Sequence, residues 1–119
     1  KAPAALGPYS QAIETKDGRN IYISGQIPLK PGATEIAATD FKDQAIQVFK
    51  NIFEIVAAAN CSPKDIVKLT IFLIDLKNFE ELNQIMVDLF DMPFPARSTV
   101  QVSALPKGAL IEIDAVISK

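Results

Sequence analysis

Residues 66–74 constrain the fold of this chain more than any other segment. Their sequence, IVKLTIFLI, is nearly continuous in β-branched, aliphatic and aromatic residues, which is typical of a central strand covered on both faces. Such a strand is stable only within a sheet, so the rest of the chain must supply partner strands and helices to cover them. The chain length suits one hydrophobic core, and we expect residues 1–119 to form a single domain.

The segments on either side of this strand have the apolar spacing of amphipathic helices. In residues 39–60 apolar side chains recur at three- and four-residue intervals, and Thr39 and Asp40 are suited to cap the helix. Residues 78–90 repeat this pattern, with Asn78 as the expected cap. The apolar faces contain Phe41, Ala45, Val48, Phe49, Ile52, Phe53, Val56 and Ala59 in the first helix, and Phe79, Leu82, Ile85, Met86, Leu89 and Phe90 in the second.

Four further segments have the pattern of β-strands. They are residues 11–15, 20–24, 97–104 and 109–117. An Asp-Gly turn signal separates the first two, and a Leu-Pro-Lys-Gly sequence separates the last two, so we expect a hairpin at each place. The order β-β-α-β-α-β-β predicts an α+β fold, a two-layer sandwich in which two helices cover one face of a mixed sheet.

The other face of this sheet has no predicted cover. Phe72 and Ile74 would lie on that open face and form an exposed apolar patch in a monomer. Such patches usually mark a surface that binds a partner. We therefore expect a homo-oligomer that packs through the open face.

The composition excludes several classes of function. The absence of histidine rules out a Ser-His-Asp triad and histidine-based metal sites, and the single cysteine cannot build a zinc site, so we expect no metal. The net charge is −2 and the basic residues are scattered, which argues against nucleic acid as a partner. No apolar run approaches the roughly 20 residues that cross a bilayer. With one cysteine and no membrane segment, we expect a cytoplasmic protein.

Arg97 and Glu112 are the charges that stand out in the last two strands. Arg97 follows Phe94 and two prolines, so its surroundings are rigid and partly apolar, which suits a guanidinium that grips a carboxylate. Glu112 lies between two isoleucines and could orient or deprotonate a water molecule. Two simpler interpretations remain open: a solvated sheet face, or an ion pair between these two residues.

A hairpin would keep these two residues apart within one chain. With the turn at residues 105–108, Arg97 would lie opposite about Val116, and Glu112 opposite about Gln101. Four residues along a strand span about 13 Å, which is too far for both to touch one small molecule. We therefore predict that Glu112 of one subunit meets Arg97 of another, at a subunit interface.

The sequence as a whole resembles the reactive intermediate deaminase A family, also called the YjgF family. The matching segments extend over nearly the whole chain: residues 7–11 (GPYSQ), 24–28 (SGQIP), 51–57, 67–73 (VKLTIFL), 79–83, 95–98 (PARS), 105–107 (LPK) and 111–113 (IEI). The resemblance implies a chorismate-mutase-like fold and a homotrimer, with the three sheets forming a barrel and the active sites between subunits. It also implies hydrolysis of reactive enamine and 2-imino acids, such as 2-aminoacrylate and 2-iminobutanoate, to 2-oxo acids and ammonia without a cofactor.

The resemblance also implies roles for individual residues. Arg97 would bind the substrate carboxylate and Glu112 would position the attacking water. The remaining pocket residues would be Tyr9, Ser24, Gly25 and Asn83. Many members have cysteine where this chain has Thr99, which can donate a hydrogen bond but excludes thiol chemistry; the water-based mechanism does not need a thiol.

Two other functions remain open for the same trimer. One is the binding of a 2-oxo acid without turnover, for which Arg97 would serve equally well. The other is the RNA cleavage or inhibition of translation attributed to some members. The acidic charge balance and the lack of histidine make this last function the least favoured.

Overall fold

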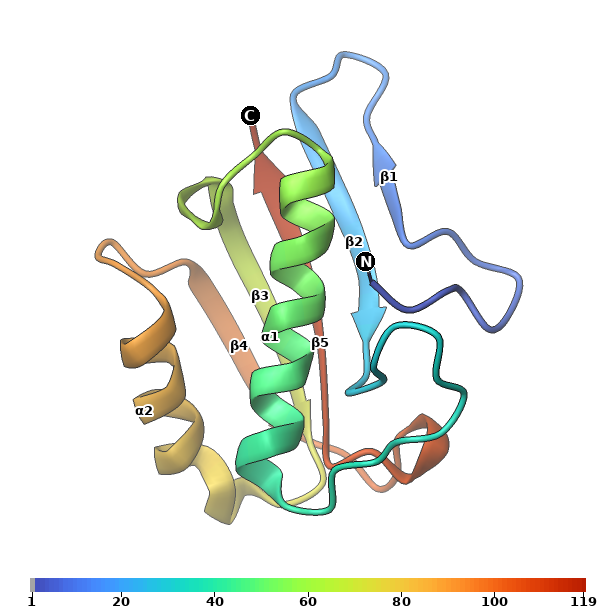
Figure 1. The fold of residues 1–119 in the computed structure, drawn as a ribbon. Coiled ribbons are helices and arrows are strands. Elements are labelled where there is room, and N and C mark those ends of the chain that lie inside the picture. Colours follow the sequence, from blue (N-terminus) through green and yellow to red (C-terminus); the bar gives the residue numbers. More distant parts are fainter. Residues whose placement is uncertain (1) are drawn as a thin grey trace.

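Two α-helices pack against one face of a five-stranded mixed sheet in the computed structural model, which describes residues 2–119 (Figure 1). The strands are β1 (Ala12–Glu14), β2 (Asn20–Gln26), β3 (Ile66–Leu73), β4 (Ala96–Gln101) and β5 (Ile111–Ser118). The helices are α1 (Phe41–Ala58) and α2 (Phe79–Leu89), with short 3-10 turns η1 (Pro63–Asp65), η2 (Leu76–Asn78) and η3 (Pro106–Gly108). The predicted α+β class and element order are confirmed.

The two helices begin where the sequence places them, but only one has the expected cap. The side chain of Asp40 accepts a hydrogen bond from the backbone N–H of Asp43 at 3.1 Å, as an N-cap should. Asn78 precedes α2 but makes no capping hydrogen bond. Instead, Asp75 accepts from the backbone N–H of Lys77 at 2.9 Å and caps the preceding turn η2, which leads directly into α2.

The predicted hairpin between the last two strands is wrong. The sheet order is β1-β2-β5-β3-β4, so β3 separates β4 from β5. Strand β5 is antiparallel to both of its neighbours, whereas β4 runs parallel to β3 at the sheet edge. Arg97 therefore does not lie opposite Val116, nor Glu112 opposite Gln101: the backbone partner of Arg97 is Leu69, and that of Glu112 on β3 is Phe72.

Burial and connectivity explain this arrangement. The core-facing side chains of β5 are at most 2% exposed: Ile111, Ile113, Ala115 and Ile117. A strand this apolar is most stable with neighbours on both sides, whereas β4 carries Arg97 and Thr99 toward the helices and is better tolerated at an edge. Helix α2 connects β3 to β4, and a helical crossover makes neighbouring strands parallel.

Strand β3 has partners on both sides but only one covered face. Leu69 and Ile71 are fully buried beneath the helices, while Thr70 and Phe72 on the other face are half-buried. Within one chain, β3 is therefore covered on one face only, and cover for its second face stays a prediction that depends on self-association. Strand β3 lies inside the sheet between β5 and β4, which suits its apolar sequence. Phe72 on the open face is half-buried.

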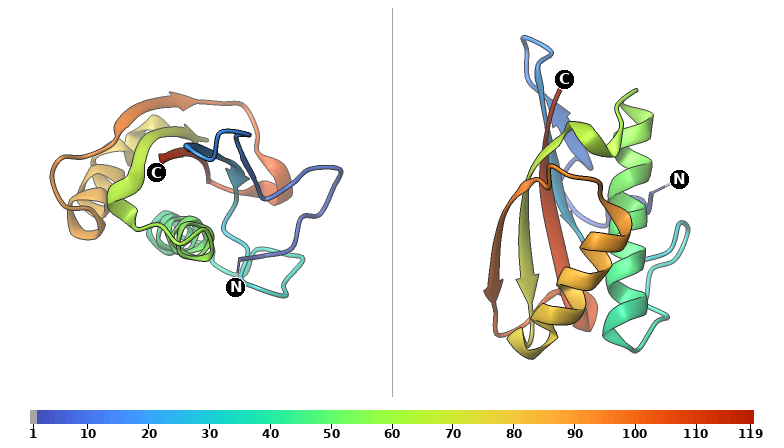
Figure 2. Two further views of the ribbon diagram at one scale, coloured as in Figure 1. Left: turned by 90° about the horizontal axis from the view of Figure 1, so that it is seen from above. Right: turned by 90° about the vertical axis from the view of Figure 1, so that its left-hand side faces the viewer.

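The face of the sheet away from the helices is uncovered within residues 2–119. Figure 2 shows α1 and α2 on one side of the curved sheet, with no helix on the other. Phe72 and Ile74 are half-buried on this open face. More exposed apolar side chains there are Ile13 at 58%, its strand partner Tyr22 at 51%, and Val100 at 43%. No helix in the described part of the chain has the length and apolar character needed to span a membrane.

Candidate functional site

Arg97 lies on the helix-facing side of β4 and is held by side chains of α2. Its Nη1 donates hydrogen bonds to Oδ1 of Asn83 at 2.6 Å and to Sδ of Met86 at 3.5 Å. Its Cζ atom lies 4.9 Å from the ring centroid of Phe79, which is a cation–π contact. Since no carboxylate lies within salt-bridge distance of Arg97 in residues 2–119, its charge is available to an anionic ligand.

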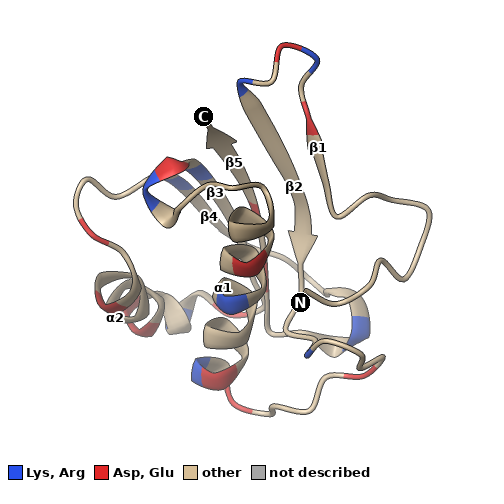
Figure 3. Cartoon of the chain, turned by 45° about the horizontal axis from the view of Figure 1, so that its top comes forward, with Lys and Arg blue, Asp and Glu red and all other residues tan. Residues whose placement is uncertain are grey.

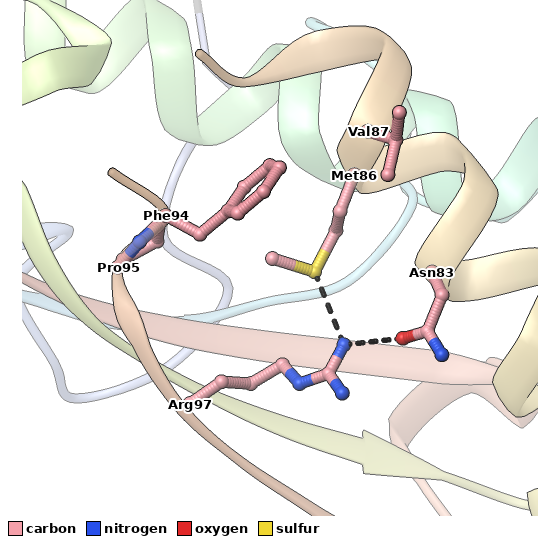
Figure 4. Close-up of a pocket in the computed structure, with 6 residues that line it drawn as sticks. All are labelled: Asn83, Met86, Val87, Phe94, Pro95 and Arg97. Atoms are coloured by element: carbon pink, nitrogen blue, oxygen red, sulfur yellow. Dashed lines mark hydrogen bonds between the residues drawn. The ribbon is translucent and has the colours of Figure 1, made fainter. Parts of the chain in front are cut away.

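A hollow of about 360 Å³ opens beside this guanidinium (Figure 4). Its lining is mostly apolar and consists of Asn83, Met86, Val87, Phe94, Pro95 and Arg97. A cation in partly apolar surroundings binds a carboxylate more strongly than one in open water, because screening by water is reduced. This hollow is therefore suited to a small anionic ligand with an aliphatic side chain.

Thr99 lies on the same face of β4 as Arg97 but does not line this hollow. Its backbone partner is the fully buried Ile71, which places it toward the helix layer. Its Oγ1 is buried and has no hydrogen-bond partner in the described residues. An unpaired buried hydroxyl is costly and rare in folded proteins, so this oxygen is a candidate to bind a ligand or a second subunit.

Glu112 lies on the opposite face of the sheet. It occupies the middle of β5 with the buried Ile111 and Ile113 on either side, so its side chain points to the open face. Burial raises the pKa of the Glu112 carboxyl above its ordinary value, and the charge of Asp114, two residues along the same face, raises it further. A carboxylate with a raised pKa is a better proton acceptor, as general-base catalysis requires.

A second hollow, of about 430 Å³, surrounds Glu112. Its lining comes from the N-terminal segment, the end of β2 with the following loop, η3 and β5: Leu6, Tyr9, Ser24, Gly25, Ile27, Leu29, Pro106, Lys107 and Glu112. The structure thus brings together four of the residues selected from the sequence: Tyr9, Ser24, Gly25 and Glu112. Arg97 and Asn83 line the first hollow instead.

Gly25 permits a very close approach of the Glu112 carboxylate. The pairing of β2 with β5 is irregular between Ile23 and Gln26, so the chain bulges at Ser24 and Gly25. A Cβ atom on Gly25 would lie 2.3 Å from Oε2 of Glu112. The neighbouring Ser24 hydroxyl donates a hydrogen bond to the backbone carbonyl of Ser10, which ties the bulge to the segment that carries Tyr9.

Sequence reasoning missed Lys107, which lines the same hollow as Glu112. Its φ of 61° is in the left-handed region, which is uncommon for residues other than glycine. Its Nζ lies 3.0 Å from Oε2 of Glu35, so it connects η3 to the loop that follows β2. The sequence LPKG at residues 105–108 marks the turn, but nothing in it shows that the lysine reaches that loop.

Sequence reasoning also missed Phe79 and Met86 as contacts of Arg97. With Asn83 they lie at spacings of four and three residues along α2, so they form one stripe on the helix surface. The same spacing is also typical of a core-facing helix stripe, so by itself it does not distinguish a contact of Arg97 from core packing.

Arg97 and Glu112 belong to two separate hollows. They lie on opposite faces of the sheet and on strands separated by β3, with an offset of three residues along β3 between their partners Leu69 and Phe72. Each displacement, along and across the strands, amounts to about 10 Å.

Among the described residues, no three His, Cys, Asp or Glu side chains are grouped so that they could hold a metal ion.

Comparison with known proteins identifies the family. Residues 1–118 match the family model described as Endoribonuclease L-PSP. The human 2-iminobutanoate/2-iminopropanoate deaminase is 46% identical over 116 residues, which are 98% of this chain and 83% of that protein.

Solved structures agree with this match over the whole fold. The crystal structure of RidA from the Antarctic bacterium Psychrobacter sp. PAMC 21119 superposes with a TM-score of 0.94 at 46% identity, covering 100% of this chain and 94% of that one. TdcF of E. coli, crystallised with bound serine, has a TM-score of 0.91 at 41% identity, covering 99% of this chain and 93% of that one. The chain therefore belongs to the reactive intermediate deaminase A family, also called the YjgF family.

Proposed function

We propose that this protein hydrolyses reactive enamine and 2-imino acids, such as 2-aminoacrylate and 2-iminobutanoate, to 2-oxo acids and ammonia. The observation that carries the proposal is the separation of two complementary groups: Arg97 lines one hollow and Glu112 another, on opposite faces of one sheet. The Glu112 hollow also contains Lys107, but the Nζ of this lysine lies 3.0 Å from Oε2 of Glu35. Of the two cations, only Arg97 has no carboxylate partner among residues 2–119, and it lines the other hollow. The 46% identity to a human 2-iminobutanoate/2-iminopropanoate deaminase supports the choice of substrate.

The two halves would meet between subunits of a homotrimer. The uncovered face carries Glu112 together with the exposed side chains of Tyr22 and Val100, and such a surface favours self-association. Contact through this face would set the Glu112 hollow of one subunit against the edge strand β4 of the next, where Arg97 lies. Tyr9, Ser24 and Gly25 would then come from the first subunit, and Arg97, Asn83 and Thr99 from the second.

The residues support a mechanism without a covalent intermediate. The Arg97 guanidinium holds the substrate carboxylate, and Glu112 orients a water molecule next to C2 of the protonated imine. As the water oxygen bonds to C2, Glu112 accepts one of its protons, and the C=N π electrons pass to nitrogen. Glu112 then returns that proton to the amine nitrogen, and the C–N bond breaks as ammonia leaves with the bonding electrons. The hydroxyl passes its proton to the Glu112 carboxylate as the 2-oxo acid forms, and the released ammonia takes this proton to become ammonium. The protein contributes orientation and proximity, which can lower a barrier by several kcal/mol.

Binding without turnover is the second candidate function. It is favoured by the likeness to TdcF, whose crystal structure contains bound serine, because the Arg97 hollow would hold the carboxylate of an amino or 2-oxo acid equally well.

RNA cleavage is disfavoured by the charge distribution. In Figure 3 lysine and arginine alternate with acidic residues over helices and loops and form no basic stripe. The free thiol of Cys61 suits a reducing compartment such as the cytoplasm.

Trapping of the imine tests the enzymatic proposal. A threonine dehydratase generates 2-iminobutanoate, and semicarbazide captures whatever imine remains. The protein should lower the rate of semicarbazone formation, and Arg97→Ala should abolish this effect while the trimer stays intact by light scattering. If the wild-type protein leaves semicarbazone formation unchanged but binds 2-oxobutanoate, the binding function is the correct one.

A further inference from the structure

The contacts of Arg97 with the rest of residues 2–119 leave one edge of its guanidinium free. We propose that Phe79 and Met86 are positioning residues, which fix the guanidinium so that the edge formed by Nε and Nη2 receives the substrate carboxylate. This inference rests on the proposed function, in which Arg97 binds that carboxylate.

The first step is to count the donors. A guanidinium has five N–H groups in one plane, and Nη1, which lies on the side of Cδ, carries two of them. Nη1 donates to Oδ1 of Asn83 and to Sδ of Met86, so both of its hydrogens have partners. Within residues 2–119, Nε and Nη2 of Arg97 make no hydrogen bond. Figure 4 shows them on the edge turned away from Asn83 and Met86.

The free edge has the geometry that a carboxylate requires. The Nε–H and the nearer Nη2–H point in parallel, and two parallel N–H groups match the two oxygens of a carboxylate. The end of the guanidinium formed by Nη1 and Nη2 cannot offer such a pair while Nη1 is bound to α2. The arrangement therefore selects one of the two bidentate edges before a ligand arrives.

The third contact fixes the plane of the guanidinium. Phe79 lies under it at 4.9 Å from Cζ, and a ring in this position limits rotation about the last bonds of the side chain. Phe79, Asn83 and Met86 come from one helix, so they move together. All three are neutral, so they orient Arg97 without neutralising it. A carboxylate in their place would also orient the guanidinium, but it would compete with the ligand.

Side-chain NMR of arginine tests the edge directly. The chain has only two arginines, Arg97 and the exposed Arg19, so a spectrum selective for Nε–H contains two signals and an internal control. Arg97→Lys assigns the signals by removing one. Addition of 2-oxobutanoate should move the Nε–H resonance of Arg97 downfield and leave that of Arg19 in place. A saturable binding isotherm with an unmoved Arg97 signal would overturn the assigned edge.

Substitutions test the positioning residues. Phe79→Leu removes the ring but keeps an apolar side chain, and should weaken 2-oxobutanoate binding about fivefold; Phe79→Tyr, which keeps the ring, should restore it. Met86→Leu removes the sulfur acceptor at similar volume and should weaken binding about threefold. Both weakening variants should raise KM for the imine more than they lower kcat. Phe53→Leu is the matched control, because Phe53 packs against Phe90 and does not contact Arg97.

The outcomes separate this inference from the proposed function. Full binding of 2-oxobutanoate by Arg97→Ala would overturn the role of Arg97 in holding the carboxylate. Loss of binding in Arg97→Ala, together with full affinity in Phe79→Leu and Met86→Leu, would overturn the positioning roles alone. An equal loss of affinity in Phe53→Leu would show that the effect reflects general stability, and would also overturn them.

Discussion

The carboxylate of Glu112 lies in the space where Gly25 lacks a side chain. A Cβ atom at residue 25 would be 2.3 Å from Oε2 and 2.9 Å from Cδ of Glu112, which is closer than non-bonded atoms approach. Glycine is needed here because its backbone must come within contact distance of the carboxylate, and its φ is not in the left-handed region. The bulge at the end of β2 and the glutamate of β5 thus form one unit.

Gly25→Ala should displace the Glu112 carboxylate and reduce imine hydrolysis on the order of 100-fold, since a displacement of about 1 Å at a reacting group can cost that much. The semicarbazide assay measures the loss, and circular dichroism checks that the fold persists. Gly7→Ala is the control, because the nearest atom to its Cβ would be a Tyr9 ring carbon at 3.6 Å, an ordinary contact. Equal activity in both variants would contradict the role of this approach.

The pH dependence of activity should report the environment of Glu112. Glu112 must be ionised to accept a proton from water, and its pKa is raised by burial and by Asp114. Activity should therefore fall on acidification at a higher pH than an ordinary glutamate would give. Asp114→Asn removes one cause of the raised pKa and should move this acidic limb to lower pH, as measured by kcat/KM against pH.

Asp88→Asn is the control for that shift, because Asp88 is an exposed carboxylate on α2 that contributes nothing to the raised pKa of Glu112. It should leave the acidic limb in place. An acidic limb that is the same in the wild type and Asp114→Asn would assign the titration to another group.

The sequence predicted the helices and the strand content well because these depend on local periodicity. The apolar faces of α1 and α2 and the cap at Asp40 follow from spacing within one helix. The pairing of strands is not local. Residues 105–108 resemble a hairpin turn, yet the buried side chains of β5 take it between β2 and β3, and the crossover through α2 sets β4 beside β3.

The residues of the candidate site were found by motif, but their arrangement was not. The alternation of polar and apolar residues predicts one polar face on β4, with Arg97, and one on β5, with Glu112. If β4 and β5 formed a hairpin, these two polar faces would lie on the same side of the sheet. The parallel pairing of β4 with β3 turns Arg97 toward α2, while Glu112 faces away from it. The prediction that Arg97 and Glu112 lie apart within one chain is correct, but it rests on an offset along a hairpin that does not exist. The actual causes are the opposite faces of the sheet and the intervening strand β3. Lys107 could not be predicted, because its contact with Glu35 joins loops distant in sequence.

Thr99 should show a trade-off between stability and binding. Its buried Oγ1 has no partner, so the isosteric Thr99→Val should raise the free energy of unfolding by about 1 kcal/mol. If the hydroxyl binds the substrate, as proposed, the same variant should raise KM for the imine. Urea unfolding and steady-state kinetics measure the two effects, and Thr99→Ser, which retains the hydroxyl, should keep KM near the wild-type value. A loss of stability in Thr99→Val would mean that the hydroxyl already has a partner in the assembled protein.

The open face of the sheet should control assembly. Val100 is 43% exposed on that face, and Val100→Arg would place a charge in the proposed contact. Light scattering should then show a monomer, and imine hydrolysis should be lost although Arg97 and Glu112 are unchanged. Ile46→Arg is matched in exposure at 39% but lies on α1, in the helix layer, so it should leave both assembly and activity intact. A trimer that persists in Val100→Arg would exclude this face as the contact.

Mixed assemblies test whether the site is shared between subunits. Arg97→Ala and Glu112→Gln should each be inactive alone, because each lacks one half of every site. When the two variants are co-expressed with different tags and assemble at random, about a quarter of the sites should combine an intact Arg97 with an intact Glu112 from the neighbouring chain. Activity should therefore return to roughly that fraction of the wild-type value. Arg97→Ala co-expressed with a chain carrying both substitutions has no intact Arg97 and serves as the negative control. If both residues acted within one chain, every site in the mixture would keep a lesion and no activity would return.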